Sequence, residues 1–169
     1  MRKLLVVALA GTLAFVLLSA RARTASAQTG GSFGLGLIVG EPTGVSGKLY
    51  IKRSHAIDGA IGLGFADGRG IHVHADYLWH PVVLTRTPSF DLPLYVGLGG
   101  RLQSHGKRDN RDEHLALGPR GVVGILFGFR NAPIDVFLEV AVGVDLVAND
   151  DTPRSGLTVD LAAGVRYYF

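Results

Sequence analysis

Four polar side chains that share one face of a predicted strand could bind a metal ion. His72, His74 and Asp76 alternate along the chain, and His80 follows at the same parity. A His-x-His pair on a strand can present two imidazoles to one metal ion. Neighbouring side chains on one face of a strand lie ~7 Å apart, and no closed set of further ligands accompanies these residues. We therefore interpret them as polar groups inside the protein, and we predict neither a metal nor a cofactor.

A second group has the residue types of acyl transfer. Ser104 and His105 are followed by Asp112, Glu113 and His114 in the most charged segment of the chain. A nucleophile, a base and an acid would suit a lipid-modifying enzyme, but a loop of such residues shows none of the geometry that catalysis requires. We interpret residues 104–113 as a solvated loop whose charges bind a surface partner or lipid phosphates, or pair with one another. No catalytic residue is predicted, and the enzyme stays an alternative.

The segments that must position these groups alternate with a period of two, which is the pattern of β-strands. In residues 156–169 the odd positions from Leu157 to Phe169 are apolar, whereas the even positions include Asp160, Gly164 and Arg166. Pro81 is expected to end the fourth strand, with a connection over residues 82–91, and a bulge is expected near Pro119. In residues 28–169 no segment has apolar residues spaced three and four positions apart, so no long helix is predicted there. The predicted strands are 32–40, 45–52, 57–65, 71–80, 92–103, 114–127, 134–146 and 156–169.

The face that holds the charges decides the fold class. Nearly every strand has an uninterrupted apolar face, and the opposite face mixes glycine with full charges. In lipid only helices and closed barrels satisfy the backbone, and outer-membrane barrels place apolar residues outward and polar ones inward, with aromatic girdles. The sequence therefore predicts an all-β, eight-stranded antiparallel up-and-down transmembrane β-barrel. The girdle candidates are Tyr77, Trp79, Tyr167 and Phe169.

Eight strands enclose a lumen that side chains can fill. Inward glycines would leave room for the charged side chains, and buried opposite charges must pair because an isolated buried ion costs several kcal/mol. We expect this ionic plug to exclude a wide pore, with a narrow ion channel as the less favoured alternative. The predicted lumen ion-pair network consists of Lys48, Asp58, Asp76, Arg101, Arg120, Glu139, Asp145, Asp160 and Arg166.

The first 27 residues are predicted to be a cleavable signal peptide. Arg2 and Lys3 precede an apolar run, and Ala25 and Ala27 form an A-x-A cleavage site. The run has fifteen residues, whereas a membrane-spanning helix needs about twenty. Residues 28–169 then form one barrel domain without cysteine. The leader contains four of the seventeen basic residues, which leaves thirteen against fourteen acidic ones and no argument for a nucleic-acid partner.

Three stretches resemble small eight-stranded bacterial outer-membrane β-barrel proteins, specifically the uncharacterised outer-membrane β-barrel domain family. They are His72-Val73-His74-Ala75-Asp76-Tyr77-Leu78-Trp79-His80, Leu92-Pro93-Leu94-Tyr95-Val96-Gly97 and Val165-Arg166-Tyr167-Tyr168-Phe169. The resemblance implies an outer-membrane location and a structural, adhesive or surface-interaction role. It also implies that Val165, Tyr167 and Phe169 form an assembly signal for the barrel-assembly machinery and periplasmic chaperones. Outer-membrane lipid is the other expected partner, and the resemblance identifies no surface partner.

The order of the loops agrees only partly with an outer-membrane topology. Both termini of such a barrel should lie on the periplasmic side, with the longer loops outside. Residues 66–70, 104–113 and 148–155 fit as outer loops. The connection at 41–44 is short for an outer loop, and the connection at 82–91 is long for a periplasmic turn.

Overall fold

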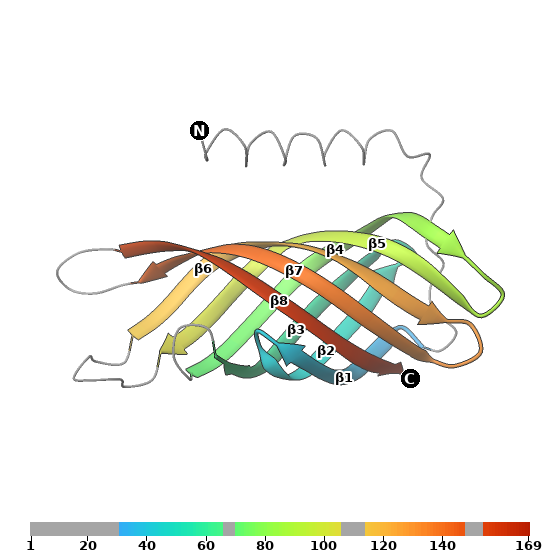
Figure 1. Ribbon diagram of the computed structural model, residues 1–169, viewed down its shortest axis with the longest axis horizontal. Coiled ribbons are helices and arrows are strands. Elements are labelled where there is room, and N and C mark those ends of the chain that lie inside the picture. The colour runs from blue at the N-terminus through green and yellow to red at the C-terminus, as the bar shows by residue number, and fades with distance from the viewer. Residues whose placement is uncertain (1–30, 66–69, 106–113, 148–153) are drawn as a thin grey trace.

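The computed structural model of the chain is a closed barrel of eight antiparallel strands (Figure 1). The structure describes residues 31–65, 70–105, 114–147 and 154–169. The predicted signal peptide lies outside these residues. No helix in the described part of the chain has the length and apolarity needed to cross a membrane. The strands are β1 Phe33–Gly40, β2 Thr43–Lys52, β3 His55–Gly64, β4 Gly70–Arg86, β5 Phe90–His105, β6 His114–Phe129, β7 Ile134–Val147 and β8 Arg154–Tyr168.

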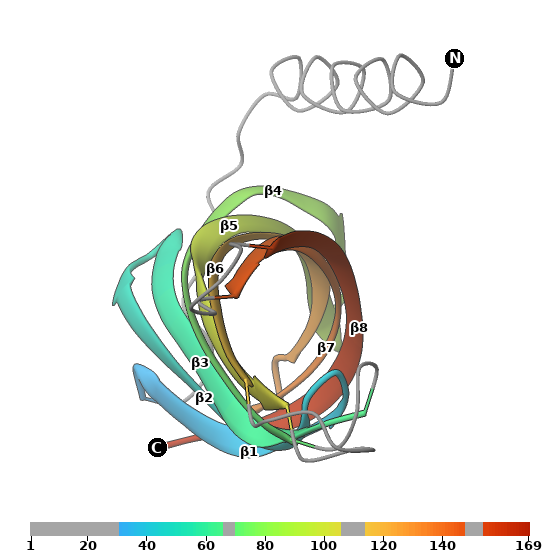
Figure 2. The same ribbon diagram turned by 90° about the vertical axis from the view of Figure 1, so that its left-hand side faces the viewer.

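Each strand pairs with its neighbours in the sequence, and β8 closes the ring on β1 (Figure 2). A path around the barrel can be traced from Gly34 by moving from each residue to its cross-strand partner on the next strand. After all eight strands this path reaches Thr158. The partner of Gly34 in β8 is instead Tyr168, ten residues further along. This stagger means that the strands are tilted against the barrel axis, as closure requires.

The two ends of the barrel have different connections. One end, the turn end, has the short turns at 53–54, 87–89 and 130–133 together with Phe169. The other end, the loop end, has the two-residue turn at 41–42 and the three connections that contain undescribed residues. The N–H of Phe169 donates a hydrogen bond to the carbonyl of Phe33 at 2.9 Å, so the described ends of the chain meet at the turn end.

The prediction that Pro81 ends the fourth strand was wrong. β4 continues to Arg86, and its pairing with β5 shifts register between Trp79 and Val82 and again between Val83 and Thr85. His80 and Pro81 are both buried, so the first bulge places two successive residues on the inward side. A bulge accommodates the missing N–H of proline without the loss of a ladder hydrogen bond. The connection predicted at 82–91 is instead a three-residue turn at 87–89, comparable in length with the other turns at the turn end.

The bulge expected near Pro119 is also absent from the structure. The β5–β6 register is constant from Leu94, opposite Ile125, to His105, opposite His114. The β6–β7 ladder keeps one register on both sides of Pro119. Pro119 therefore interrupts only the β6–β7 ladder, and no extra residue is inserted there.

The predicted assignment of the two faces is confirmed by the barrel. Val136, Leu138 and Val140 face outward and are 39%, 45% and 44% exposed, and Leu98 is 76% exposed. The inward positions hold most of the described charges of the strands, and the exceptions, Lys52, Arg86 and Asp91, lie near the turn end. An isolated protein in water rarely exposes so continuous an apolar surface, since large exposed patches mark contact with a partner or a membrane. The all-β, eight-stranded antiparallel barrel predicted from the sequence is the observed fold.

Candidate functional site in the lumen

The structure places all nine residues of the predicted ion-pair network inside the barrel. Each is at most 5% exposed. They come from seven of the eight strands, and the regular alternation of each strand directs them inward. They are Lys48 on β2, Asp58 on β3, Asp76 on β4, Arg101 on β5, Arg120 on β6, Glu139 and Asp145 on β7, and Asp160 and Arg166 on β8.

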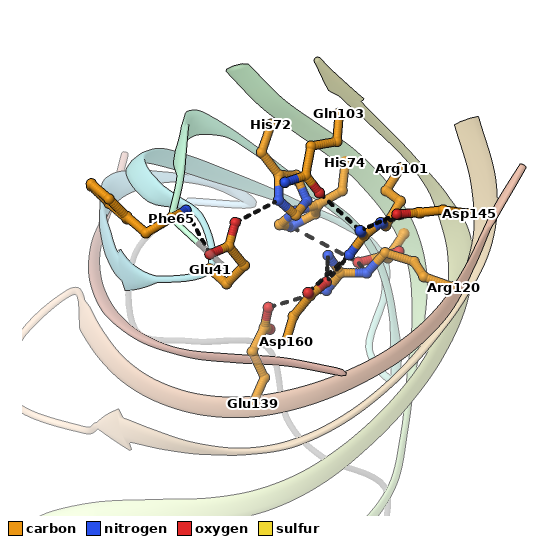
Figure 3. A network of polar contacts seen from close by, with 11 residues as sticks. Glu41, Phe65, His72, His74, Arg101, Gln103, Arg120, Glu139, Asp145 and Asp160 are labelled. Carbon is orange, nitrogen blue, oxygen red and sulfur yellow. Dashed lines mark hydrogen bonds and ion pairs between the residues drawn. The ribbon is translucent and has the colours of Figure 1, made fainter. Parts of the chain in front are cut away.

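Arg101 is the centre of the polar contacts nearest the loop end (Figure 3). Its Nε and Nη2 donate to the two carboxylate oxygens of Asp145 at 2.8 and 2.7 Å. Its Nη1 donates to both oxygens of Asp160 at 2.8 Å, and Nη2 also donates to Gln103 Oε1 at 2.8 Å. One guanidinium thus joins β5, β7 and β8 across the lumen. Its planar fork matches two carboxylates, which an ammonium group would not do.

Arg120 links this group to the middle of the lumen. Its Nε lies 3.2 Å from Asp76 Oδ2, and its Nη2 lies 3.5 Å from Glu139 Oε1. Its Nη1 lies 3.9 Å from Asp160 Oδ2, so the two arginines share one carboxylate. The network therefore runs continuously from Asp145 to Glu139.

Arg166 forms a separate group nearer the turn end. Its Nη2 lies 2.6 Å from Asp58 Oδ2, and its Nε and Nη2 donate to Ser46 Oγ at 3.0 and 2.9 Å. The guanidinium carbon lies 3.8 Å from the centre of the Phe137 ring, which adds a cation–π contact. These contacts fix β8 against β2, β3 and β7.

Lys48 is placed in the lumen, but the structure does not bring it to a carboxylate. It forms none of the ion pairs seen among the described residues, although Asp58 is its cross-strand partner. Its Nζ lies 2.9 Å from His80 Nε2, and 4.9 and 5.1 Å from the ring centres of Tyr50 and Tyr95. An imidazole and two aromatic faces therefore surround this ammonium group.

Two carboxylates at the turn half of the lumen receive tyrosine hydroxyls. Tyr95 donates to Glu139 Oε2 at 2.8 Å, and Tyr168 donates to Asp135 Oδ2 at 2.6 Å. Asp135 was absent from the predicted network although it is fully buried. The alternation along β7 puts Asp135 on the inward side, and this signal could have identified it. The alternation along β5 and β8 likewise puts Tyr95 and Tyr168 on the inward side.

Apolar side chains occupy part of the lumen, which the sequence analysis did not anticipate. One buried cluster contains Leu78, Val122, Leu126 and Tyr95, and a second contains Ile38 and Phe137 with two alanines. These residues sit at inward positions between the charged groups. Ion pairs and hydrocarbon side chains therefore share the described lumen.

Two inward glycines leave the space that bulky lumen residues occupy. A Cβ at Gly124 would overlap the Tyr95 ring, and a Cβ at Gly164 would overlap the Phe137 ring. Tyr95 and Phe137 are both at most 1% exposed, so neither ring can move aside into solvent. The inward glycines were predicted to make room for charged side chains, whereas these two make room for aromatic rings.

The three inward histidines of β4 lie in different surroundings. The rings of His72 and His74 are 5.5 Å apart, and His74 Nε2 is 4.0 Å from Asp76 Oδ2. His80 contacts Lys48 instead. Within the described ranges no three His, Asp or Glu side chains are grouped so that they could hold a metal ion.

Glu41 is an interior contact that the sequence analysis missed. It lies in the two-residue turn between β1 and β2, where its Oε2 accepts a hydrogen bond from the Phe65 N–H at 2.8 Å. Its Oε1 lies 3.5 Å from His72 Nδ1, and its own N–H donates to the Leu161 carbonyl at 3.0 Å. The short turn thus folds over the loop end of the lumen (Figure 3).

The residues considered for acyl transfer are only partly within the described structure. Ser104 Oγ accepts a hydrogen bond from the Ile71 N–H at 3.4 Å. Residues 106–113 and the side chains of His105 and His114 lie outside the described part. Ser104 has no base among its described contacts, so the described residues assemble no catalytic group.

Comparisons with known proteins show the fold. No protein-family model matches the chain, and no curated protein matches it. Among solved structures, the N-terminal β-barrel domain of Pseudomonas aeruginosa OprF is similar, with a TM-score of 0.58 and 14% sequence identity. The similarity covers 83% of this chain and all of that domain. The chain therefore has the fold of a small eight-stranded bacterial outer-membrane β-barrel.

Proposed function

We propose that this protein is an outer-membrane β-barrel with a structural or surface-interaction role. The single observation that supports the proposal is the separation of the two faces. Apolar side chains cover the outside of every strand, and the charges of the strands are enclosed except for Lys52, Arg86 and Asp91 near the turn end. Such a surface suits acyl chains, and a closed barrel leaves no unpaired edge in lipid.

The contents of the lumen favour a structural role over transport. The guanidinium groups of Arg101, Arg120 and Arg166 are each engaged by carboxylates, and two buried apolar clusters share the lumen with them. A permeating ion would have to displace buried ion pairs and then pass hydrocarbon, which costs several kcal/mol for each step. A narrow channel is therefore the weaker proposal.

The route to the membrane is part of the same proposal. The signal peptide at 1–27 directs export, and residues 28–169 fold in the outer membrane with the turn end toward the periplasm. Val165, Tyr167 and Phe169 serve as the assembly signal for the barrel-assembly machinery and periplasmic chaperones. All three side chains face outward, where a partner can reach them.

Envelope fractionation combined with a heat-modifiability gel tests the proposal. We expect the protein in the outer-membrane fraction, and a band whose mobility changes when the sample is boiled. A polypeptide that is soluble and monodisperse without detergent would contradict the proposal. Mass spectrometry of envelope lipids separates the enzyme alternative, since His105→Ala or His114→Ala should leave a structural protein's lipid profile unchanged.

A further inference from the structure

The outer surface carries an apolar groove over β4, β5 and β6. It encloses about 420 Å³ and is lined by eight uncharged residues. The groove exists because Gly121 has no side chain between Leu98 and Val142, its cross-strand neighbours. The lining residues are Tyr77, Trp79, Val96, Gly97, Leu98, Gly121, Val122 and Val123.

The groove runs from the turn end toward the middle of the barrel. Trp79 is paired with His55, which is the first residue of β3 at the turn end. Gly121 lies near the middle of β6. A linear apolar chain that enters beside Trp79 would therefore extend toward the middle of the apolar band.

Two exposed cations lie beside the entrance of the groove. Lys52 is paired with His55, and Arg53 is the next residue in the β2–β3 turn. His55 joins this turn to the groove, because its Nδ1 lies 2.9 Å from the Tyr77 hydroxyl and it is the backbone partner of Trp79. Amphipathic aromatic rings prefer the level of lipid headgroups, where neighbouring basic residues attract anionic lipids.

The acidic residues described at this end do not neutralise Lys52 and Arg53. Asp91 pairs with Arg130 at 2.6 Å, and Asp135 is buried and accepts the Tyr168 hydroxyl. The rim beside the groove is therefore positive, which complements a phosphate-bearing headgroup.

The geometry points to a binding site for one anionic phospholipid of the periplasmic leaflet. One acyl chain lies in the groove over Gly121, and the headgroup phosphate contacts Lys52 and Arg53. This inference rests on the proposed function, because it needs the barrel in a membrane with its turn end toward the periplasm. It adds a specific lipid site to a surface that otherwise contacts lipid without selection.

The groove can be filled without disturbing the barrel. A Cβ at Gly121 would meet only Leu98 Cδ2 at 3.7 Å and the Gly97 carbonyl oxygen at 3.9 Å, which are ordinary contacts. Gly47 is a matched control on the outward face of β2, where a Cβ would meet its nearest atom at 3.8 Å. Gly121→Leu should occlude the groove, and Gly47→Leu makes the same chemical change elsewhere.

Native mass spectrometry of the full mature chain in detergent tests the site, with phosphatidylglycerol and phosphatidylcholine of identical acyl chains as probes. We expect the wild type and Gly47→Leu to retain one phosphatidylglycerol in preference to phosphatidylcholine. Gly121→Leu should lose both lipids. Lys52→Gln and Arg53→Gln should each weaken phosphatidylglycerol binding about fivefold, whereas Arg130→Gln should not.

Three results would overturn the inference. Retention of phosphatidylglycerol by Gly121→Leu at the wild-type level would show that the groove is not the site. Equal retention of the two lipids by the wild type would show that the cations do not select the headgroup. A dimer that Gly121→Leu dissociates, with lipid retention unchanged, would assign the groove to a second copy of the chain. Heat modifiability is measured on each sample, and a wild type that lacks it would instead contradict the proposed function.

Discussion

Arg101 and Asp145 form a two-point ion pair inside the barrel, with Nε–Oδ1 and Nη2–Oδ2 distances of 2.8 and 2.7 Å. Both side chains are almost completely buried. Charge-assisted bidentate pairs are among the strongest polar contacts in proteins, but their removal matters mainly because a charge is left alone. Here the loss of Arg101 would leave two carboxylates, since Asp160 depends on the same guanidinium.

Arg101→Leu should lower the free energy of unfolding by about 3–5 kcal/mol, because Asp145 and Asp160 lose their partner in a buried site. Urea unfolding in lipid vesicles, followed by heat modifiability, measures the change. Arg130→Gln removes an ion pair with Asp91 at the exposed rim and should cost about 0–1 kcal/mol. Equal effects of the two substitutions would contradict the view that the lumen network holds the strands together.

Val140→Arg places a charge on the outward face near the middle of β7. We expect a loss of about 2–4 kcal/mol in the free energy of unfolding from a bilayer, and a loss of about 0–1 kcal/mol for Leu157→Arg near the loop end of β8. The same urea titration in vesicles gives both values. A tolerated Val140→Arg would mean that this face does not contact acyl chains.

Gly124→Ala should destabilise the barrel by about 1–3 kcal/mol, since the added methyl group overlaps the buried Tyr95 ring. It should also separate Tyr95 from Glu139. Gly121→Ala, three residues away and outward, has room for its methyl group and serves as the control. Thermal unfolding in detergent compares the two, and a neutral Gly124→Ala would show that the lumen is loosely packed.

Purified protein should leave a planar lipid bilayer electrically silent. The ion pairs of Arg101, Arg120 and Arg166 and the apolar clusters around Leu78 and Phe137 occupy the described lumen. Conductance is recorded after heat modifiability has shown that the inserted protein is folded. Regular conductance steps at constant voltage would establish a channel.

Phe169→Ser should reduce the fraction of chains that assemble, because the outward terminal aromatic is the proposed assembly signal. Phe169 is 69% exposed, and its ring lies 5.0 Å from that of Tyr167. Phe33→Ser changes an outward aromatic of β1 at the same end and is the control. The heat-modifiable fraction in isolated envelopes is the readout, and equal losses would deny the terminal residue a special role.

The sequence predicted the faces of the strands well, because a period of two is a local property. Parity alone placed Arg101, Asp145 and Val140 on their observed sides. The prediction for Pro81 was wrong, because the sequence of one strand does not show that a bulge can accommodate the proline within a longer strand. The boundary of β4 depended on the pairing with β5, which is not a local property.

Partner choice inside the lumen could not be predicted from parity. Arg101 reaches Asp160 because the tilt of the strands brings distant strands to one level of the lumen. Lys48 contacts His80 rather than its cross-strand neighbour Asp58. The groove at Gly121 depends on the residues of three strands together, so no single strand pattern could indicate it.

Glu41 has a consequence for the order of folding. Its backbone contacts the last strand through Leu161, while its carboxylate contacts Phe65 at the end of the second hairpin. Glu41 can contact both partners only after β8 has paired with β1 and closed the barrel. A spectroscopic label next to this turn would therefore report the final closing event, separately from the earlier growth of the hairpins.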